Sequence, residues 1–436
     1  MNIFVYPSES AEKKMTSIAN RSLDFDKKDI TRVADIVEDV KKNKDKALIK
    51  YVNQFDSPNV NIETLKVTSE EVRAATNLVD KRFLRTLNLA VKQIKSYHSR
   101  QLKKSWIDVQ RPGTLVGQLV NPVDAAGIYV PGGKGGNTPL ISSVLMGAIP
   151  AAIAGVKKII MTTPPTFDGT VNPYIIVAAK KVGIKDIYKA GSAWAIAALA
   201  YGTETVPKVN IIAGPGNIYV TLAKKMLTGT VGIDMIAGPS EILVIADHGA
   251  NPKFIAADLL SQSEHDPLAS SILATNCKEL ATAVLLEVKK QILNLERREI
   301  AKHSIEKYGA IMVTPDIPTA IELSNRIAPE HLELHIQYPF DHIGMIKNAG
   351  AVFIGEYTPE PVGDYIAGPN HVLPTAGTAR FSSALSVDHF IKKTSLIHYS
   401  KKAFEKEAKD IICFSELEGL DGHTKSIKIR MEKQKK

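Results

Sequence analysis

The pattern of hydrophobic and polar positions divides the chain near residue 123. Up to about residue 110, apolar residues recur at helical spacing, most clearly over 30–55 and 82–100. From residue 123 onward, short apolar runs rich in β-branched residues alternate with longer Ala-rich runs. This alternation predicts strands within 125–133, 157–165, 185–191, 208–217 and 240–247 and helices over 139–155, 172–183, 193–202 and 218–227.

A second alternation follows and predicts another α/β domain. We expect helices over 252–266, 279–295 and 317–334 and strands over 270–276, 309–314 and 342–355. Strands that alternate with helices of this length indicate βαβ units and parallel, twisted sheets. The segment 360–383 is rich in Gly and Pro and predicts a loop, and the polar tail from residue 381 predicts helices.

Composition narrows the class of protein. The chain has 436 residues, 44% of them hydrophobic, which is ample for large cores. The longest apolar runs fall short of a membrane span and the N-terminus lacks the features of a signal peptide. Cys277 and Cys413 are far apart, which argues against a thiolate metal site and fits a reducing compartment. We therefore expect a cytoplasmic protein.

The net charge of +9 leaves two interpretations open. Basic runs occur at 41–46 and 425–436. Such runs are typical either of a solvated surface with a frayed tail or of a protein that binds nucleic acid. No common nucleic-acid-binding motif accompanies them, so we expect no nucleic-acid partner.

Four groups of residues are candidates for chemistry. Two Gly-rich turns, 130–139 and 213–220, follow predicted strands but complete neither common phosphate-binding motif. Gln262 and His265 lie three residues apart, where a helix would point both the same way. Each group has a structural alternative: a plain turn for the loops, a surface polar pair for these two side chains.

The other two groups pair a carboxylate with an imidazole. Glu330 is adjacent to His331, and such a pair offers two general bases if both side chains point into one site. The tail pairs Glu418 with His423, and the loop 360–383 offers Asp364 and His371 as help for the Gln262–His265 pair. A helix terminus, a surface loop and a surface tail remain the plain alternatives.

Taken together, these stretches resemble the histidinol dehydrogenase family. The similarity runs through "GIYVPGG", "GPGN", "GIDMIAGPSEILVIAD", "ADLLSQSEHDPLAS", "NRIAPEHLEL", "GDYIAGPNHVLPTAGTARFSS" and "ELEGLDGH", in one order over roughly residues 20–430. The resemblance implies the oxidation of L-histidinol through the aldehyde to L-histidine with two NAD⁺. It also implies one Zn²⁺ per subunit, bound by Gln262, His265, Asp364 and His423.

The resemblance also implies roles for single residues. His331 would be the base that takes the alcohol proton, and Glu330 the base that activates water on the aldehyde. Substrate contacts would come from Ser240, Gln262, His265, Glu330, His331, Asp364, His371, Glu418 and His423. Glu418 and His423 would come from the neighbouring subunit, so the site would be shared within a homodimer.

The cofactor contacts include one departure from the family pattern. Tyr129 and Asn217 match NAD-contacting positions, but Trp194 stands where the family has glutamine and Ser192 where it has glycine. The indole of Trp194 has no acceptor. It either stacks on a ring of NAD⁺ or blocks the cofactor, and in the second case Trp194→Gln should lower the KM for NAD⁺.

The implied fold comprises two incomplete Rossmann-like parallel-sheet domains in an intertwined homodimer. We expect an N-terminal arm at 1–22, a first α/β domain with the zinc and catalytic residues at 23–122 and 238–380, a second on the NAD side at 123–237, and a dimer-crossing helical tail at 381–436. Two other functions stay open. One is a related zinc and NAD alcohol dehydrogenase that acts on another diol or amino alcohol, and the other is a zinc-containing nucleic-acid-associated protein.

Overall fold

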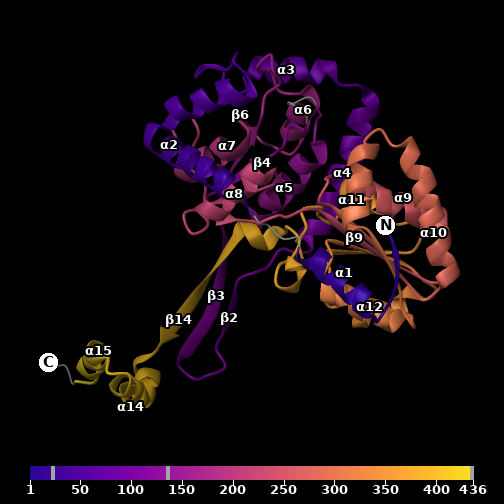
Figure 1. Ribbon diagram of the computed structural model, residues 1–436. Coiled ribbons are helices and arrows are strands. Elements are labelled where there is room, and N and C mark those ends of the chain that lie inside the picture. The colour runs from indigo at the N-terminus through magenta and orange to yellow at the C-terminus, as the bar shows by residue number, and fades with distance from the viewer. Residues whose placement is uncertain (21–24, 134–137, 433–436) are drawn as a thin grey trace. The chain divides into compact units, whose positions relative to one another are not determined.

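The computed structural model describes residues 1–20, 25–133 and 138–432. The chain forms two compact units. The first comprises residues 1–101 and 123–390, and the second comprises residues 102–122 and 391–436. Figure 1 shows the elements of each.

A six-stranded sheet of the first unit has the order β1-β11-β10-β9-β12-β13, and all its described pairings are parallel. Helices cover both of its faces. α1 (Glu9–Ala19) and α12 (Ile317–Ile327) pack on one face. α9 (Pro252–Ser263), α10 (Lys278–Gln291) and α11 (Arg298–Tyr308) pack on the other. The strands are β1 Ile3–Val5, β9 Glu241–Ala246, β10 Ser270–Thr275, β11 Ala310–Val313, β12 His331–His335 and β13 Ala351–Ile354.

A five-stranded parallel sheet, with the order β6-β5-β4-β7-β8, forms the second layered region of this unit. Its strands are β4 Ala125–Tyr129, β5 Lys158–Thr163, β6 Asp186–Lys189, β7 Ile211–Ala213 and β8 Gly232–Ile233. The helices between them are α5 Ile141–Ala154, α6 Pro173–Lys181, α7 Ser192–Tyr201 and α8 Ile218–Leu227. The predicted alternation of strands and helices, and with it the α/β fold class, is confirmed. The strand predicted over 342–355 was too long, because Pro339–Met345 forms a 3₁₀ turn and only Ala351–Ile354 is a strand.

The N-terminal helices pack beside this five-stranded sheet. α2 (Lys27–Tyr51) contacts α7 and α8, α3 (Ser69–Leu78) contacts α6, and α4 (Lys81–Ser99) contacts α5. The sequence-based scheme had grouped residues 23–122 with 238–380, whereas these contacts associate α2–α4 with the helices of 123–237. The arm, too, belongs to a sheet, because β1 pairs with β11. The boundaries between domains stay a prediction.

The second unit is an antiparallel sheet followed by two helices. The strands β2 (Trp106–Asp108), β3 (Thr114–Pro122) and β14 (Ile391–Tyr399) have the order β14-β3-β2. α14 (Lys401–Leu417) and α15 (Asp421–Met431) end the described chain. The expectation of a wholly helical tail was therefore wrong for 391–399. Its polar run "KKTS" does not look like a strand, but pairing with β3 over nine residues compensates.

Short helical turns replace part of the predicted loop at 360–383. Glu360–Val362 forms α13, Gly363–Ala367 continues it as a π-helical turn, and Thr378–Arg380 is a 3₁₀ turn. The other short turns are the π-helical Val52–Asp56 and the 3₁₀ turns Ile292–Asn294, Pro339–Met345 and Val387–Phe390. In the part of the chain that the structure describes, no helix is both long and apolar enough to span a bilayer.

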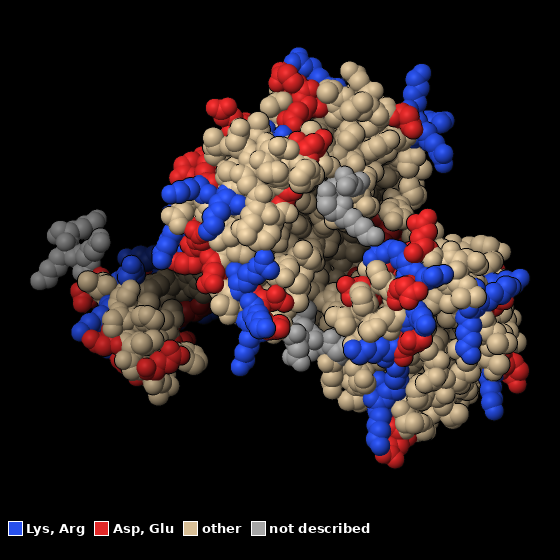
Figure 2. Space-filling view, turned by 45° about the horizontal axis from the view of Figure 1, so that its top comes forward, with Lys and Arg blue, Asp and Glu red and all other residues tan. Residues whose placement is uncertain are grey.

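Acidic side chains stand among the basic ones on the face drawn in Figure 2. On α2, Lys50 lies 2.8 Å from Asp39 and Lys41 lies 3.5 Å from Glu38. Basic side chains on this face are therefore interspersed with acidic ones.

Candidate active site

Strand β12 has one polar face, which is directed toward α9. Its sequence is His-Leu-Glu-Leu-His, and alternate side chains of a strand point to opposite faces. Leu332 and Leu334 pack with α1 and α12. His331, Glu333 and His335 therefore face the α9 side, and all three are buried. Buried ionisable groups on a central strand are costly unless they have partners, so this face is a candidate site.

His331 is the first residue of β12, not part of a helix. The predicted helix 317–334 was too long, because α12 ends at Ile327 and Ala328 adopts φ +53° before Pro329. The strand start lets Glu330 and His331 approach each other, with 3.9 Å between Glu330 Oε2 and His331 Nδ1. The alternative that Glu330 and His331 belong to a helix terminus is therefore wrong.

The backbone of Glu241, at the start of β9, holds both side chains. Its N–H donates to Glu330 Oε2 at 3.1 Å, and its carbonyl oxygen lies 3.0 Å from His331 Nδ1. A carbonyl can only accept, so Nδ1 carries the proton, and the neutral imidazole has its lone pair on Nε2. Burial raises the pKa of Glu330 to about 7, although the His331 ring opposes the shift. The neutral His331 ring and the ionised Glu330 carboxylate therefore offer two proton acceptors.

Two carboxylates from the turn after β13 complete this group. Glu360 and Asp364 each place an oxygen near His331, with the three ligand-type atoms within 4.8 Å of one another. Glu360 Oε1 lies 3.8 Å from His331 Nε2. Burial, then the neighbouring Asp364 and Glu333, raise the pKa of Glu360 to about 8. Glu360 was not among the site residues predicted from the sequence. Its position four residues before Asp364, which one helical turn would bring together, could have indicated it.

Gln262 and His265 lie at the end of α9. The helix ends at Ser263, so Gln262 occupies its last turn and His265 the turn beyond, and the predicted common helical face is only partly correct. Gln262 is buried, and among the described residues its Oε1 has no hydrogen-bond partner. His265 is exposed, yet partial desolvation by the protein around it lowers its pKa, while Asp364 opposes that shift.

His371 and Ser240 lie around the same group. Burial lowers the pKa of His371, while Asp364 and His331 also act on it, so these side chains are close enough to interact. Ser240 directly precedes Glu241, whose backbone holds Glu330 and His331. Glu418, at the end of α14, and His423, in α15, belong to the second unit, and their part in this site stays a prediction.

The donor set suits a zinc ion. A buried amide oxygen without a partner, an imidazole and a carboxylate are available from Gln262, His265 and Asp364. Imidazole with oxygen ligands is a common set for Zn²⁺. An ion would also satisfy the buried Gln262 oxygen, whose isolation costs free energy.

A cavity of about 470 Å³ lies at the carboxyl ends of the strands of the five-stranded sheet. All three residues that the resemblance assigns to cofactor binding line it. Tyr129 ends β4, Trp194 lies in the first turn of α7 after β6, and Asn217 caps α8 after β7. Open α/β sheets bind ligands at this edge. Part of the Gly-rich turn 130–139 lies outside the described residues, but Pro131, Gly132 and Gly133 contribute to the lining.

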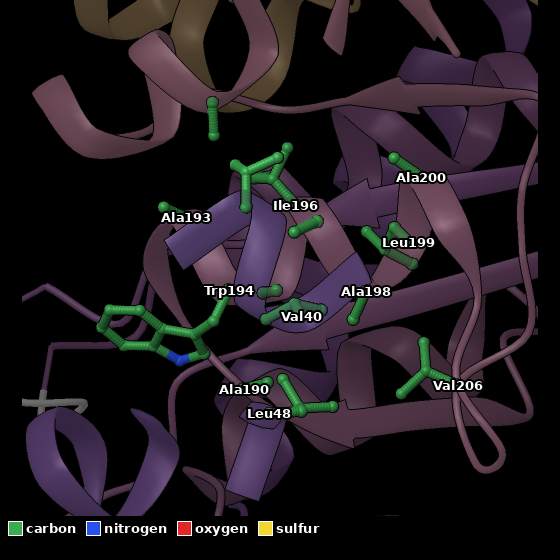
Figure 3. Close-up of a cluster of buried hydrophobic side chains, with 14 of the residues drawn as sticks. Val40, Leu48, Ala190, Ala193, Trp194, Ile196, Ala198, Leu199, Ala200 and Val206 are labelled. Atoms are coloured by element: carbon green, nitrogen blue, oxygen red, sulfur yellow. The ribbon is translucent and has the colours of Figure 1, made fainter. Parts of the chain in front are cut away.

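Trp194 forms a wall of this cavity. In Figure 3 its indole extends to one side of the buried cluster that contains Ile196 and Leu199. The ring stacks on Phe55 at 5.3 Å between centroids, and its Nε1 donates to Asp56 Oδ2 at 2.9 Å. Ser192, the other departure from the family, has φ +47°, a conformation that favours glycine. Its N–H donates to the Tyr129 hydroxyl at 3.1 Å.

Fold and site together define an α/β enzyme with paired proton acceptors on one sheet and a ligand cavity at the edge of the other. Comparison with known proteins agrees. A family model for histidinol dehydrogenase matches residues 19–431. The chain belongs to the histidinol dehydrogenase family and is an oxidoreductase.

Individual relatives cover nearly all of the chain. The histidinol dehydrogenase of Desulfotalea psychrophila is 51% identical over 425 residues, which are 98% of both chains. That of Bacillus subtilis is 53% identical over 398 residues, 91% of this chain and 92% of the relative. The crystal structure of histidinol dehydrogenase from Elizabethkingia anophelis has a TM-score of 0.92 at 38% identity and covers 99% of this chain and 98% of that one.

Proposed function

We propose that this protein oxidises L-histidinol through the aldehyde to L-histidine with two NAD⁺. The observation that carries the proposal is the buried Glu330–His331 pair, whose two acceptors are set by one backbone residue, Glu241. Two oxidations in one site require a proton acceptor for the alcohol and another for water. The close relatives are histidinol dehydrogenases, which supports this substrate and does not favour another diol or amino alcohol.

His331 is the base of the first oxidation in this proposal. Its Nδ1–H is committed to the Glu241 carbonyl, which fixes the tautomer and leaves Nε2 to accept the alcohol proton. The substrate's carbon then loses hydride to NAD⁺ more easily, because the oxygen gains alkoxide character. The Glu241 contact also fixes the orientation of the ring.

Glu330 is the base of the second oxidation. Burial raises the pKa of this carboxyl to about 7, so near neutral pH it is partly ionised and can accept a proton from water. Attack of that water on the aldehyde gives the hydrate, which loses the second hydride. The Glu241 N–H orients the carboxylate for this step.

One zinc per subunit would be held by Gln262, His265 and Asp364 with His423 of the partner subunit. When bound, the ion would supply a fixed point for the substrate's imidazole and amino nitrogens and so orient the alcohol carbon. Ser240 and His371 would complete the contacts to substrate, together with Glu418 of the partner subunit. The buried Gln262 oxygen, which has no hydrogen-bond partner among the described residues, supports this assignment.

The cavity at the five-stranded sheet would hold NAD⁺, with Tyr129, Trp194 and Asn217 against it. When bound, the cofactor accepts hydride. A shared homodimer site, a cytoplasmic location and the lack of a nucleic-acid partner belong to the same proposal.

The test is NADH formation at 340 nm with purified protein, zinc, NAD⁺ and L-histidinol. A ratio of about two NADH per histidinol consumed is expected, because each oxidation step delivers one hydride. Protein that contains zinc but shows no turnover would contradict the proposal. A ratio of about one would limit the protein to the first oxidation.

A further inference from the structure

A second group of ligand-type side chains lies at the other end of the polar face of β12. Asp258 comes from α9, and Glu333 and His335 come from β12. One oxygen or nitrogen from each lies within 4.8 Å of the other two, and all three residues are buried. Neither the proposed proton acceptors nor the proposed zinc ligands belong to this group.

The hydrogen bonds among the described residues leave part of this arrangement unexplained. Neither ring nitrogen of His335 has a hydrogen-bond partner there, and neither has Glu333 Oε2. Nε2 nevertheless points between two carboxylates, 3.4 Å from Glu333 Oε2 and 3.7 Å from Asp258 Oδ2. The other oxygen of Glu333 is committed, because it accepts the Glu360 N–H at 2.9 Å. A buried imidazole aimed at two oxygens without bonding to either indicates a missing partner.

The charge of the group points to a cation. Two carboxylates are buried together, and among the described residues no Lys or Arg forms an ion pair with Asp258, Glu333 or Glu360. Asp258 and Glu333 also lie within side-chain hydrogen-bonding reach of each other, which requires a proton on one of them if no cation is bound. The group must therefore be neutralised, either by protons or by a bound cation.

The distances favour an ion. Ligand atoms at ~2.1 Å from a tetrahedral metal stand about 3.4 Å apart, because the angle between them is about 109°. The separations of 3.4 and 3.7 Å match this spacing, while they are long for hydrogen bonds.

We propose that Asp258, Glu333 and His335 form a second divalent-cation site. One imidazole nitrogen with two carboxylates and no thiolate suits zinc or manganese better than magnesium or calcium, which prefer oxygen ligands alone. The ion's role is structural. It fixes Glu333, and Glu333 in turn fixes the backbone of Glu360 at the start of α13.

The test is the metal content of the purified full-length protein and four variants, after loading with zinc or manganese and gel filtration. The wild type should hold about two ions per chain, and His335→Gln and His265→Ala about one each. The double variant should hold almost none. His303→Gln, which changes an exposed histidine of α11, is the matched control and should keep about two.

The same five proteins separate this proposal from the proposed zinc site. About one ion in the wild type, lost in His265→Ala and kept in His335→Gln, overturns the second site and leaves the first intact. About one ion, lost only in His335→Gln, supports the second site and contradicts the first. If every variant except the control loses its metal, Asp258→Asn, which keeps the side-chain shape, decides the case. Metal retained at the wild-type level in Asp258→Asn overturns the proposal.

Cobalt gives an independent signature. In the His265→Ala background, Co²⁺ at a site with one imidazole and two carboxylates should produce visible d–d absorption, and His335→Gln should abolish it. An unchanged spectrum in the double variant also overturns the proposal.

Discussion

The indole N–H of Trp194 donates a 2.9 Å hydrogen bond to Asp56, a residue 138 positions earlier in the chain. The same carboxylate oxygen accepts the Gly191 N–H at 3.0 Å, so Asp56 ties the start of α7 to the π-helical turn after α2. With Phe55 stacked on the ring, the indole is a fixed wall of the cavity. Trp194 therefore leaves space for a ligand and does not fill the cavity.

This arrangement reverses the effect expected of Trp194→Gln. Loss of the flat ring should raise the KM for NAD⁺ by a factor of about 3 to 10, since one aromatic contact contributes ~1 kcal/mol. The kcat should change little, because the proposed bases lie on the other sheet. Initial rates at varied NAD⁺ measure both constants.

Trp194→Phe is the control for this experiment. It keeps an aromatic face but loses the donor to Asp56, so its KM should lie between those of the wild type and Trp194→Gln. A KM for Trp194→Gln below the wild-type value would show that the indole obstructs the cofactor.

Asp56 makes stability depend on pH. Burial raises the pKa of Asp56 to about 6, although Trp194 and Gly191 oppose the shift. A carboxyl with a raised folded-state pKa contributes its stability below the unfolded pKa, near 3.8, and loses it as pH rises through 6. The loss amounts to about 3 kcal/mol at most.

Asp56→Asn should remove this dependence. The difference in unfolding free energy, wild type minus variant, should fall between pH 4 and pH 7 and then stay level. Urea unfolding at several pH values measures it, with Asp26→Asn, an exposed cap of α2, as the control. A difference that rises with pH would contradict the assigned pKa.

Glu330 should shape the pH dependence of the second oxidation. A base must be ionised to act, and with a pKa of about 7 only about a tenth of Glu330 is ionised at pH 6. The rate of aldehyde oxidation should therefore climb with pH through about 7. Glu330→Gln should lower that rate by about 10²- to 10³-fold and remove the climb.

His331→Asn is the matched comparison for Glu330→Gln. It should slow alcohol oxidation more than aldehyde oxidation, since His331 is the proposed acceptor of the alcohol proton. Stopped-flow absorbance with each substrate separates the two steps. Equal losses of both variants on both substrates would refute the division of roles.

The sequence predicted the strands that carry the site better than it predicted the partners of the site residues. Short apolar runs such as 240–247 and 270–276 became strands because both their faces are buried. The run 331–335 was assigned to a continuation of α12, although its polar residues alternate with leucines, which is a strand pattern. These polar residues find their partners elsewhere in the chain, such as the Glu241 backbone for His331 and the Glu360 N–H for Glu333, and such contacts are not visible in local periodicity.

Glu360 and Asp56 show the same limit. Each lies in an ordinary polar stretch, and its importance comes from a neighbour far along the chain: Glu333 for Glu360 and Trp194 for Asp56. Tyr129, Trp194 and Asn217 were found through the family resemblance. The structure supplies their physical connection, since the turns after β4, β6 and β7 meet at one edge of the sheet.

Whether the tail of one subunit serves the site of another can be decided by mixing two inactive variants. Glu330→Gln/His331→Asn lacks both bases, and His423→Asn lacks the proposed fourth ligand. In a heterodimer with shared sites, the subunit with intact bases receives the other subunit's normal tail, so one of the two sites is complete.

Random reassociation of equal amounts should restore about a quarter of the wild-type activity, because half of the dimers are mixed and each has one working site. Differently tagged subunits, purified through both tags, verify the heterodimers and should show about half the wild-type activity per dimer. If the tail served its own subunit, neither site of a verified heterodimer would be complete, and activity would stay at the level of the separate variants.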